Sequence, residues 1–379
     1  MDRRSFILGT GAVALGAASA VHAAESGAGA SAGDIVIGQS AVLSGTLGPT
    51  VQVVQGGARL VFDEVNAQGG LWDRKLRLVA LDDAFDPARA QANYLALVQQ
   101  HNALACICGV GAGPTLAAIP VLRDSATPLV GATAVVDSVR DKTDGLAFYT
   151  RASQQREAAT LVQHLGTLGI QRIGVSYIGT PGGMEVLAQV QAEASKRGIS
   201  VTHAVPVAPD AKDVVDAGKA MAKDPPQAVI LYLTAMPAAT YVQTVWAQGG
   251  APAFYGMSIL AGDEAARALG AQSRGIAISQ VTPYPWDAAN TDALHYRQAA
   301  EKARVPLGYH SYEGYIAARV LVEGLRQAGR DATRAKLRAT LARLKTRVAT
   351  LDIDFTPNRH TGSEFVELVQ ARSDGRFVR

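Results

Sequence analysis

The chain has 379 residues, of which 36 are Lys or Arg, 33 are Asp or Glu, and 48% are hydrophobic. This length allows two domains of ordinary size, and the apolar content is enough to build real cores. The formal net charge is only +3, and no Lys/Arg cluster is interleaved with aromatic residues. These features exclude a nucleic-acid-binding surface, so we expect no nucleic-acid partner.

The first residues, MDRRSFILGTGAVALGAASAVHAAE, are typical of an export signal. Two arginines precede a mildly apolar stretch, and small residues in an A-x-A-like arrangement lie near Ala18 to Ala24. Arg3 and Arg4, followed by Ser-Phe-Ile, resemble a twin-arginine signal, with general secretion as the alternative route. No cysteine follows to carry a lipid. We therefore expect residues 1–24 to be removed and the mature chain to be soluble in the periplasm.

From Asp34 onward, short apolar strands alternate with amphipathic helices, the pattern of parallel sheets covered by helices. Strands are predicted at residues 34–41, 75–81, 103–110 and 127–132, and helices at residues 49–70 and 86–102. Asp86 and Pro87 suit the N-cap and the first position of the second helix. The alternation predicts one doubly wound α/β unit.

The pattern then starts again. Strands are predicted at residues 172–178, 201–207, 228–233, 253–258 and 275–281, with helices near 183–197, 212–223 and 237–249. After Pro283 come three helical stretches and two strand-like ones, at residues 290–303, 309–329, 331–344, 350–356 and 364–371. The late helices need a sheet to cover, and the first unit has too few helices. We therefore expect the chain to cross between two lobes more than once.

A glycine-rich turn, CICGVGAGPTLAAIP at residues 106–120, joins a predicted strand to a predicted helix. Gly109 and Gly111 fit the start of a dinucleotide-binding fingerprint, but Pro114 stands where its last glycine belongs, and no G-K-[ST] tail follows. The turn therefore either receives some other ligand or is only a tight turn.

Catalytic and metal-binding signatures are missing from the sequence. There is no H-E-x-x-H, no G-x-x-x-x-G-K-[ST] and no G-x-S-x-G motif, so we expect no catalytic residue, no metal and no cofactor. Asp82 and Asp83 fit the capping of a strand-to-helix loop better than acid/base chemistry. Cys106 and Cys108 lie two apart on one predicted strand face and close a disulfide badly, so buried free thiols are expected. Glu313, three residues after a histidine, is expected in a solvated or capping pair.

Five segments resemble, in sequence order, the periplasmic solute-binding proteins of the leucine/isoleucine/valine-binding type, which feed ATP-driven importers. These segments are IVIGQSAVLSGTLG, GARLVFDEVNAQGGLWDRKLRLVALDDAFDPARA, ICGVGAGPTLAAIPV, TPLVGAT and SYEGYIAARVLVEGLRQAG. The resemblance runs from about Asp34 to Arg379 and therefore covers essentially the whole mature chain.

The resemblance implies an α/β fold of two doubly wound, Rossmann-like lobes that are joined by three crossovers and close on a ligand. The crossovers would fall near residues 149–152, 280–283 and 349–353. Lobe one would then consist of residues 34–150 and 283–350, and lobe two of residues 151–282 and 351–379. Hinge closure of this kind is a known switching mode.

The resemblance also implies a ligand-binding site at the glycine-rich turn. In such proteins this turn and the helix behind it receive a ligand carboxylate. The matching positions are Gly111, Ala112, Gly113 and Thr115, with Ala132, Thr133 and Ala134 beside them. Independently of the family, free N–H groups and the partial positive charge of a helix N-terminus favour an anion there.

Several positions depart from the amino-acid-binding members. The usual serine of the carboxylate turn is replaced by Ala112 or Gly113, and the acidic residue that takes a ligand ammonium falls at about Ser258. Gly182 and Thr234 stand where those proteins often place aromatic residues that pack on the ligand. Phe85 and Gly111 stand where some of them carry a disulfide. These changes favour a larger or flatter acid, aromatic or branched, over a small zwitterion. Three tyrosines either supply the lost aromatic surface or pack in the core: Tyr177, Tyr284 and Tyr312.

The sequence therefore predicts a periplasmic receptor that closes on a small carboxylate-bearing solute, either amino acid-like or a branched or aromatic acid. Its partners would be the membrane permease and ATPase subunits of an ABC importer, and it would act as a monomer. A ligand-sensing regulatory module of the same fold and a periplasmic enzyme are the alternatives. The receptor is favoured because the chain carries no kinase, methyl-accepting or DNA-binding segment.

Overall fold

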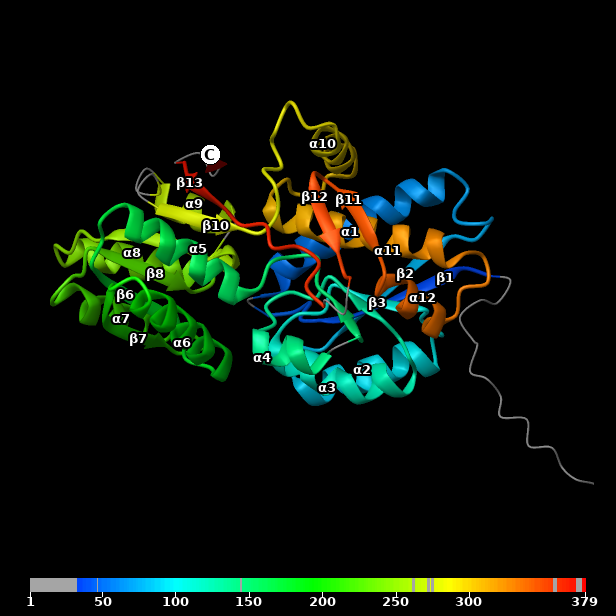
Figure 1. Ribbon diagram of the computed structural model, residues 1–379, viewed down its shortest axis with the longest axis horizontal. Coiled ribbons are helices and arrows are strands. Elements are labelled where there is room, and N and C mark those ends of the chain that lie inside the picture. The colour runs from blue at the N-terminus through cyan, green and yellow to red at the C-terminus, as the bar shows by residue number, and fades with distance from the viewer. Residues whose placement is uncertain are drawn as a thin grey trace, which may run out of the picture.

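Two α/β lobes lie side by side in the computed structural model, and several chain segments pass between them (Figure 1). The described residues are 33–45, 47–143, 145–260, 263–270, 273, 276–356, 360–372 and 377–379. The predicted export signal, residues 1–24, lies outside the described residues.

The first lobe is built on a five-stranded sheet in the order β2-β1-β3-β4-β5, in which every neighbouring pair is parallel. The strands are β1 (Ile35–Ala41), β2 (Leu76–Asp82), β3 (Ala105–Ile107), β4 (Leu129–Val130) and β5 (Ala147–Phe148). One face packs against α1 (Gly48–Ala67), α10 (Thr291–Ala303), α11 (Tyr309–Ala328) and α12 (Arg334–Leu341). The other face packs against α2 (Pro87–Gln99) and α3 (Ala112–Asp124), with α4 (Asp137–Arg140) and a 3₁₀ turn (Asp141–Thr143) close by.

The second lobe is built on a seven-stranded sheet in the order β14-β13-β10-β9-β8-β6-β7, parallel except at β13 and β14. Its strands are β6 (Arg172–Ile178), β7 (Ser200–Val207), β8 (Ala228–Tyr232), β9 (Ala253–Gly256), β10 (Ile276–Gln280), β13 (Glu367–Ala371) and β14 (Phe377–Val378). Its helices are α5 (Gln154–Thr167), α6 (Pro181–Ser195), α7 (Val214–Ala222), α8 (Ala235–Ala247) and α9 (Asp263–Leu269), with a 3₁₀ turn at Ser258–Leu260.

Side-chain caps begin several helices directly after a strand. The Asp86 carboxylate accepts a hydrogen bond from the Arg89 N–H at 2.8 Å, as predicted, with Pro87 at the first helical position. Ser153 caps α5 in the same way, and Thr180 caps α6. Each cap satisfies an amide that the helix itself leaves unpaired and so stabilises the start of the helix. These helix starts lie at the carboxyl ends of the strands. This edge is where open α/β sheets bind ligands.

The late helix α11 returns to the first lobe and packs closely on α1. A Cβ on Gly57 would lie 1.7 Å from the Ser311 carbonyl oxygen, and a Cβ on Gly314 would lie 1.9 Å from the Val54 carbonyl oxygen. Only glycine permits this approach of the two backbones. The close packing places the N-terminal part of α11, which carries Glu313, beside the first crossover.

The third crossover lies later in the chain than the sequence predicts. The predicted boundary at residue 351 is wrong, because β12 (Leu351–Asp354) forms an antiparallel hairpin with β11 (Lys345–Val348). Ile353 and Phe355 are buried in the core of the first lobe. The chain leaves that lobe only after Phe355. At residue 360 it runs beside the first crossover, because the Tyr149 N–H donates to the His360 carbonyl at 2.7 Å. The alternating apolar residues of this hairpin need the first lobe's helices to cover them.

Candidate functional site

The turns that follow β3 and β4 are tied together by backbone hydrogen bonds. The Gly111 N–H donates to the Thr133 carbonyl, and the Thr133 N–H donates to the Gly109 carbonyl, each at 2.9 Å. Gly111 has a φ of +92° at the N-cap of α3, a backbone conformation that favours glycine. The structure therefore brings the predicted residues Gly111–Thr115 and Ala132–Ala134 together on one edge of the first sheet.

The first turn of α3 offers unpaired hydrogen-bond donors. The first intrahelical bond runs from the Thr115 N–H to the Gly111 carbonyl at 3.1 Å. The amides of Ala112 and Gly113 precede this bond and therefore have no acceptor within the helix, and Pro114 has no N–H. Ala112 is half-buried and Gly113 is exposed. These two amides and the positive end of the helix dipole are features that favour an anion.

The Thr115 hydroxyl lies in the same turn and is also unsatisfied. Thr115 is 1% exposed, and its Oγ1 has no hydrogen-bond partner among the described residues. A buried hydroxyl without a partner is unfavourable, so such groups normally contact a water molecule or a ligand. The hydroxyl is therefore a further unsatisfied donor in this turn.

Asp82 and Asp83 shape the neighbouring loop, as the capping interpretation predicts. Asp82 accepts from the Ala84 N–H and from the Leu43 N–H, each at 2.9 Å, and hydrogen bonds, the one with Ser44 foremost, lower its pKa to about 2. Asp83 is buried, accepts from the Ser40 hydroxyl at 2.9 Å, and has a pKa raised by that burial. Both carboxylates are engaged in the loop.

Gly182 of the second lobe faces the first lobe. A Cβ on Gly182 would lie 3.2 Å from Cγ1 of Val136, which belongs to the loop after β4. One turn later, Glu185 accepts from the Ser138 N–H at 2.9 Å and from its hydroxyl at 2.5 Å. These contacts join α6 to α4 across the two lobes, and a side chain at Gly182 would disturb them.

Thr234 is the N-cap residue of α8, at the carboxyl end of β8. Its side chain makes no capping hydrogen bond and is partly buried. Tyr232, two residues earlier, is buried, and its hydroxyl accepts from the Gln154 amide at 2.7 Å. The structure thus places Thr234 on the same edge of the second sheet as Gly182.

Ser258 belongs to a buried network that the sequence did not reveal. Its N–H and its hydroxyl donate to the two Glu157 carboxylate oxygens, both at 2.8 Å. The same carboxylate accepts from the Ser279 hydroxyl at 2.7 Å and from Arg151 Nη2 at 3.1 Å. Both oxygens of Glu157 are therefore occupied by donors from the protein.

Arg151 connects this network to the first lobe. Its Nη1 donates to Glu313 Oε1 at 3.0 Å, and its Nη2 also contacts the Ser258 hydroxyl. The guanidinium lies between Glu157 of α5 and Glu313 of α11, and these two carboxylates raise its pKa against the effect of burial. Glu313 is thus buried in an ion pair, so its predicted assignment to a solvated or capping pair is wrong. No sequence signal could have joined residues 151, 157, 258 and 313.

The comparisons with known proteins cover nearly all of the described chain. A family model for periplasmic binding proteins matches residues 34–376. The chain belongs to this family.

Solved structures of periplasmic binding proteins extend the match. A substrate-binding periplasmic protein from Ralstonia solanacearum is 29% identical, with a TM-score of 0.84 over 91% of this chain and 99% of that one. A possible leucine/isoleucine/valine-binding protein from Rhodopirellula baltica is 26% identical, with a TM-score of 0.84 over 91% of this chain and 96% of that one. An ABC transporter solute-binding protein from R. palustris, in complex with benzoate, shares the fold at 19% identity, with a TM-score of 0.80 over 91% and 95%. No curated protein matches.

The predicted family and the type I periplasmic binding fold are confirmed, and the chain is a ligand-binding receptor by family. Among the described residues, no helix has the length and apolar character that crossing a membrane requires. The same residues contain no group of three or more His, Cys, Asp or Glu that could hold a metal ion.

The three tyrosines of this periplasmic binding protein are packing residues. Tyr177 and Tyr312 are buried in the cores of the second and the first lobe, respectively. Tyr284 packs against Trp286 and donates its hydroxyl to the Phe377 carbonyl at 2.7 Å. The structure therefore favours the core interpretation of the tyrosines.

Cys106 and Cys108 are buried free thiols, as predicted, but they do not share one face of the sheet. Cys106 packs toward α2 and α3, whereas Cys108 packs toward α1 and α11. Cys108 has a φ of +51°, and this left-handed residue interrupts the alternation of a strand. Burial raises the pKa of the Cys106 thiol to about 12 and that of Cys108 also far above its ordinary value.

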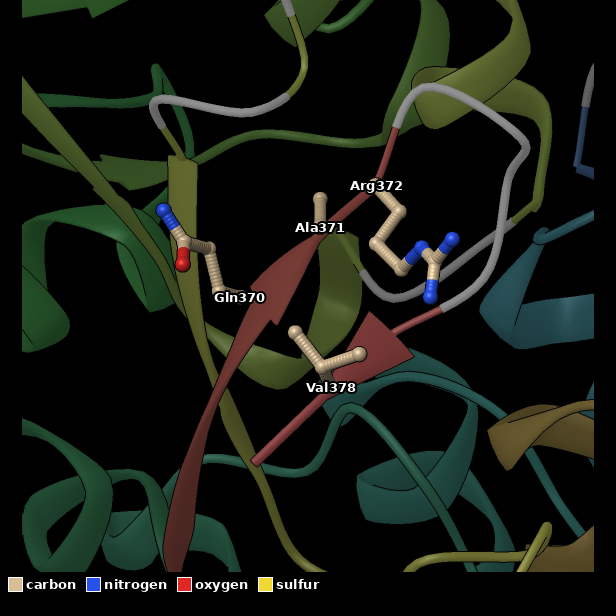
Figure 2. Close-up of a pocket in the computed structure, with 4 residues that line it drawn as sticks. All are labelled: Gln370, Ala371, Arg372 and Val378. Carbon is tan, nitrogen blue, oxygen red and sulfur yellow. The ribbon is translucent and has the colours of Figure 1, made fainter.

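A surface hollow lies apart from the predicted site residues. Figure 2 shows it at the antiparallel edge of the second sheet, lined by Gln370, Ala371, Arg372 and Val378. Its lining comes from β13, β14 and the residue after β13, and it includes no predicted site residue.

Proposed function

We propose that this chain is the periplasmic receptor of an ABC importer and that its lobes close on a small carboxylate-bearing solute. In this proposal, lobe one comprises residues 34–150 and 283–355, and lobe two comprises residues 151–282 and 356–379. The observation that carries it is the first turn of α3, where two amides have no acceptor within the helix and the buried Thr115 hydroxyl has no partner among the described residues. The receptor would act as a monomer.

We further propose that the solute is a carboxylic acid without an α-amino group, either branched or aromatic. An ammonium group enclosed in a dry cleft needs a free carboxylate to pair with. Ser258 offers only a hydroxyl, and neighbouring Glu157 already accepts from Arg151, Ser258 and Ser279. The benzoate in the R. palustris protein shows that this fold accommodates such an acid.

Delivery to a permease and an ATPase is supported by the predicted export signal and by the similarity to ABC transporter solute-binding proteins. Exchanging Arg3 and Arg4 for lysines tests the export route. Loss of the mature chain from the periplasmic fraction supports the twin-arginine route, whereas unchanged export assigns the chain to general secretion.

The ligand class is tested on the mature chain, residues 25–379, with acids paired to amino acids of the same side chain. The pairs are 4-methylpentanoate with leucine and 3-phenylpropanoate with phenylalanine. A ligand at 100 times its Kd stabilises the folded state by about 2.7 kcal/mol, which a thermal melt detects. We expect the acids to raise the Tm and the amino acids to fail. Stabilisation by the amino acids alone would contradict the missing ammonium site while leaving the carboxylate site intact.

The carboxylate position is tested by Gly113→Leu. A Cβ at this position would lie 3.2 Å from Pro87 Cγ, so a larger side chain adds bulk directly beside the exposed amide. The matched control is Gly166→Leu on the exposed surface of α5, where a Cβ would meet its nearest neighbour at 3.8 Å. Binding of the acids should be lost only in the first variant. Equal binding in both variants would refute the proposed position.

A further inference from the structure

The loop between β2 and α2 holds an aromatic side chain in an unfavourable backbone conformation. Ala84 has a φ of +49° and Phe85 a φ of +63°, and the Asp86 N–H donates to the Asp83 carbonyl at 2.9 Å across them. A turn with two left-handed residues normally takes Asn or Gly, because a Cβ is crowded there. Alanine and phenylalanine are therefore unexpected at these two positions.

Other left-handed pairs in the described chain have a simple explanation. Trp72 and Asp73 lie between the bridged residues Leu71 and Arg74, and Ala349 and Thr350 connect β11 to β12. Two-residue hairpins need this geometry to match the twist of their strands. The pair at residues 84–85 instead connects a strand to a helix, so hairpin geometry does not account for it.

Two aspartates hold this loop in place. The Phe85 N–H donates to Asp83 Oδ1 at 2.9 Å, and the Ala84 N–H donates to Asp82 Oδ1 at 2.9 Å. Asp83 is anchored in turn by the Ser40 hydroxyl of β1 at 2.9 Å. Strained residues supported by their surroundings in this way are concentrated at functional sites.

The Phe85 ring lies against the N-cap of α3. A Cβ on Gly111 would lie 2.5 Å from Phe85 Cε2 and 2.9 Å from Cζ, so the ring covers the Gly111 backbone. Gly111 directly precedes Ala112, whose amide is one of the two unpaired donors. Phe85 is nevertheless 44% exposed, and it is the only exposed phenylalanine in the part of the chain that the structure describes. The ring therefore packs on the Gly111 backbone and still keeps an exposed surface.

We infer that Phe85 determines ligand specificity by forming the wall against which the apolar body of the bound acid packs. The inference rests on the proposed function, because it takes the carboxylate to bind at Ala112 and Gly113. An acid held there by its carboxylate extends its body past the neighbouring ring. Contact with the exposed surface of Phe85 favours branched and aromatic acids over short ones.

The experiment measures Kd by calorimetry for propanoate, 4-methylpentanoate and 3-phenylpropanoate on the mature chain, residues 25–379. The variants are Phe85→Ala, Phe85→Leu and, as a matched control, Leu294→Ala. Leu294 is an apolar residue of the same lobe with a similar exposure, 42%, but it lies on α10. Melts of each ligand-free variant report its stability separately from binding.

Phe85→Ala should weaken binding of the two larger acids about tenfold or more and that of propanoate by less than about twofold. Phe85→Leu should restore part of the preference, and Leu294→Ala should leave it unchanged. An equal loss for all three acids would reduce Phe85 to a support for the turn and overturn the inference, as would unchanged affinities. If Phe85→Ala does not fold, the same comparison is made with Phe85→Leu, in which the preference for 3-phenylpropanoate should fall. Failure of every acid to bind the wild-type chain would refute the proposed function itself.

Discussion

Removing the charge of Arg151 tests whether the buried network between the lobes stabilises the molecule. Arg151→Met keeps the apolar stem and removes the guanidinium from between Glu157 and Glu313. The three side chains are 10%, 1% and 9% exposed, so solvent cannot replace the lost cation. Leaving a buried charge without its partner costs about 3–5 kcal/mol.

This loss should be large enough to measure in a thermal melt. For an unfolding unit of about 150–250 residues, each kcal/mol moves the Tm by about 2–4 °C, so Arg151→Met should melt roughly 6–20 °C lower. Ser258 and Ser279 continue to donate to Glu157, whereas Glu313 loses its hydrogen bond from Arg151. The larger share of the loss should therefore come from Glu313.

A second variant separates an uncompensated charge from lost packing. Adding Glu313→Gln to Arg151→Met removes the charge left unpaired and should recover part of the stability. Arg172→Met is the exposed control, because Arg172 pairs with Asp224 at the surface and such pairs contribute at most about 1 kcal/mol. If Arg151→Met melts no lower than Arg172→Met, or if the double variant is less stable still, the network does not stabilise the molecule as argued.

Three further outcomes follow from the structure. The pKa of Asp82 is lowered to about 2, so its carboxylate stabilises the folded state above pH 3.8, and this stabilisation is lost as the pH falls through 2. In acid titrations, the stability difference between Asp82→Asn and wild type should therefore shrink over that interval. Cys106 and Cys108 should react with a thiol reagent only in denaturant, since burial raises both pKa values; rapid labelling of the native chain would contradict their burial. Gly57→Ala should destabilise the first lobe in urea titrations because its methyl group would meet the Ser311 carbonyl, and an unchanged midpoint would show that α1 and α11 can separate.

The sequence predicts those parts of the fold that depend on local patterns. Alternating apolar strands and amphipathic helices identify two doubly wound units, and Asp86 and Pro87 locate the start of α2. The uncapped helix N-terminus at the glycine-rich turn is predictable for the same reason, because it follows from glycines and a proline directly after a strand.

Features that depend on distant partners could not be predicted. Glu313 looks like a surface residue until α11 packs on α1 and brings it to Arg151, 162 positions away in sequence. The hairpin at residues 345–354 has the alternation of any edge strand, and only its cover of helices assigns it to the first lobe. The left-handed backbone of Cys108 has no signature in its residue type, so the faces of the two thiols could not be assigned correctly.

The glycine-rich turn and the first crossover are joined through one short loop, which would give the proposed closure a physical route. The Thr133 carbonyl accepts from Gly111 at the ligand turn, and two residues later the Val135 carbonyl accepts from Arg140 Nε at 3.0 Å. Arg140, whose pKa burial lowers to about 10, also donates to the Arg151 carbonyl at 3.3 Å. Under the proposed function, a ligand bound at the turn would act on a backbone that Arg140 links to Arg151. Closure is favoured only by contacts that differ between the open and the closed state.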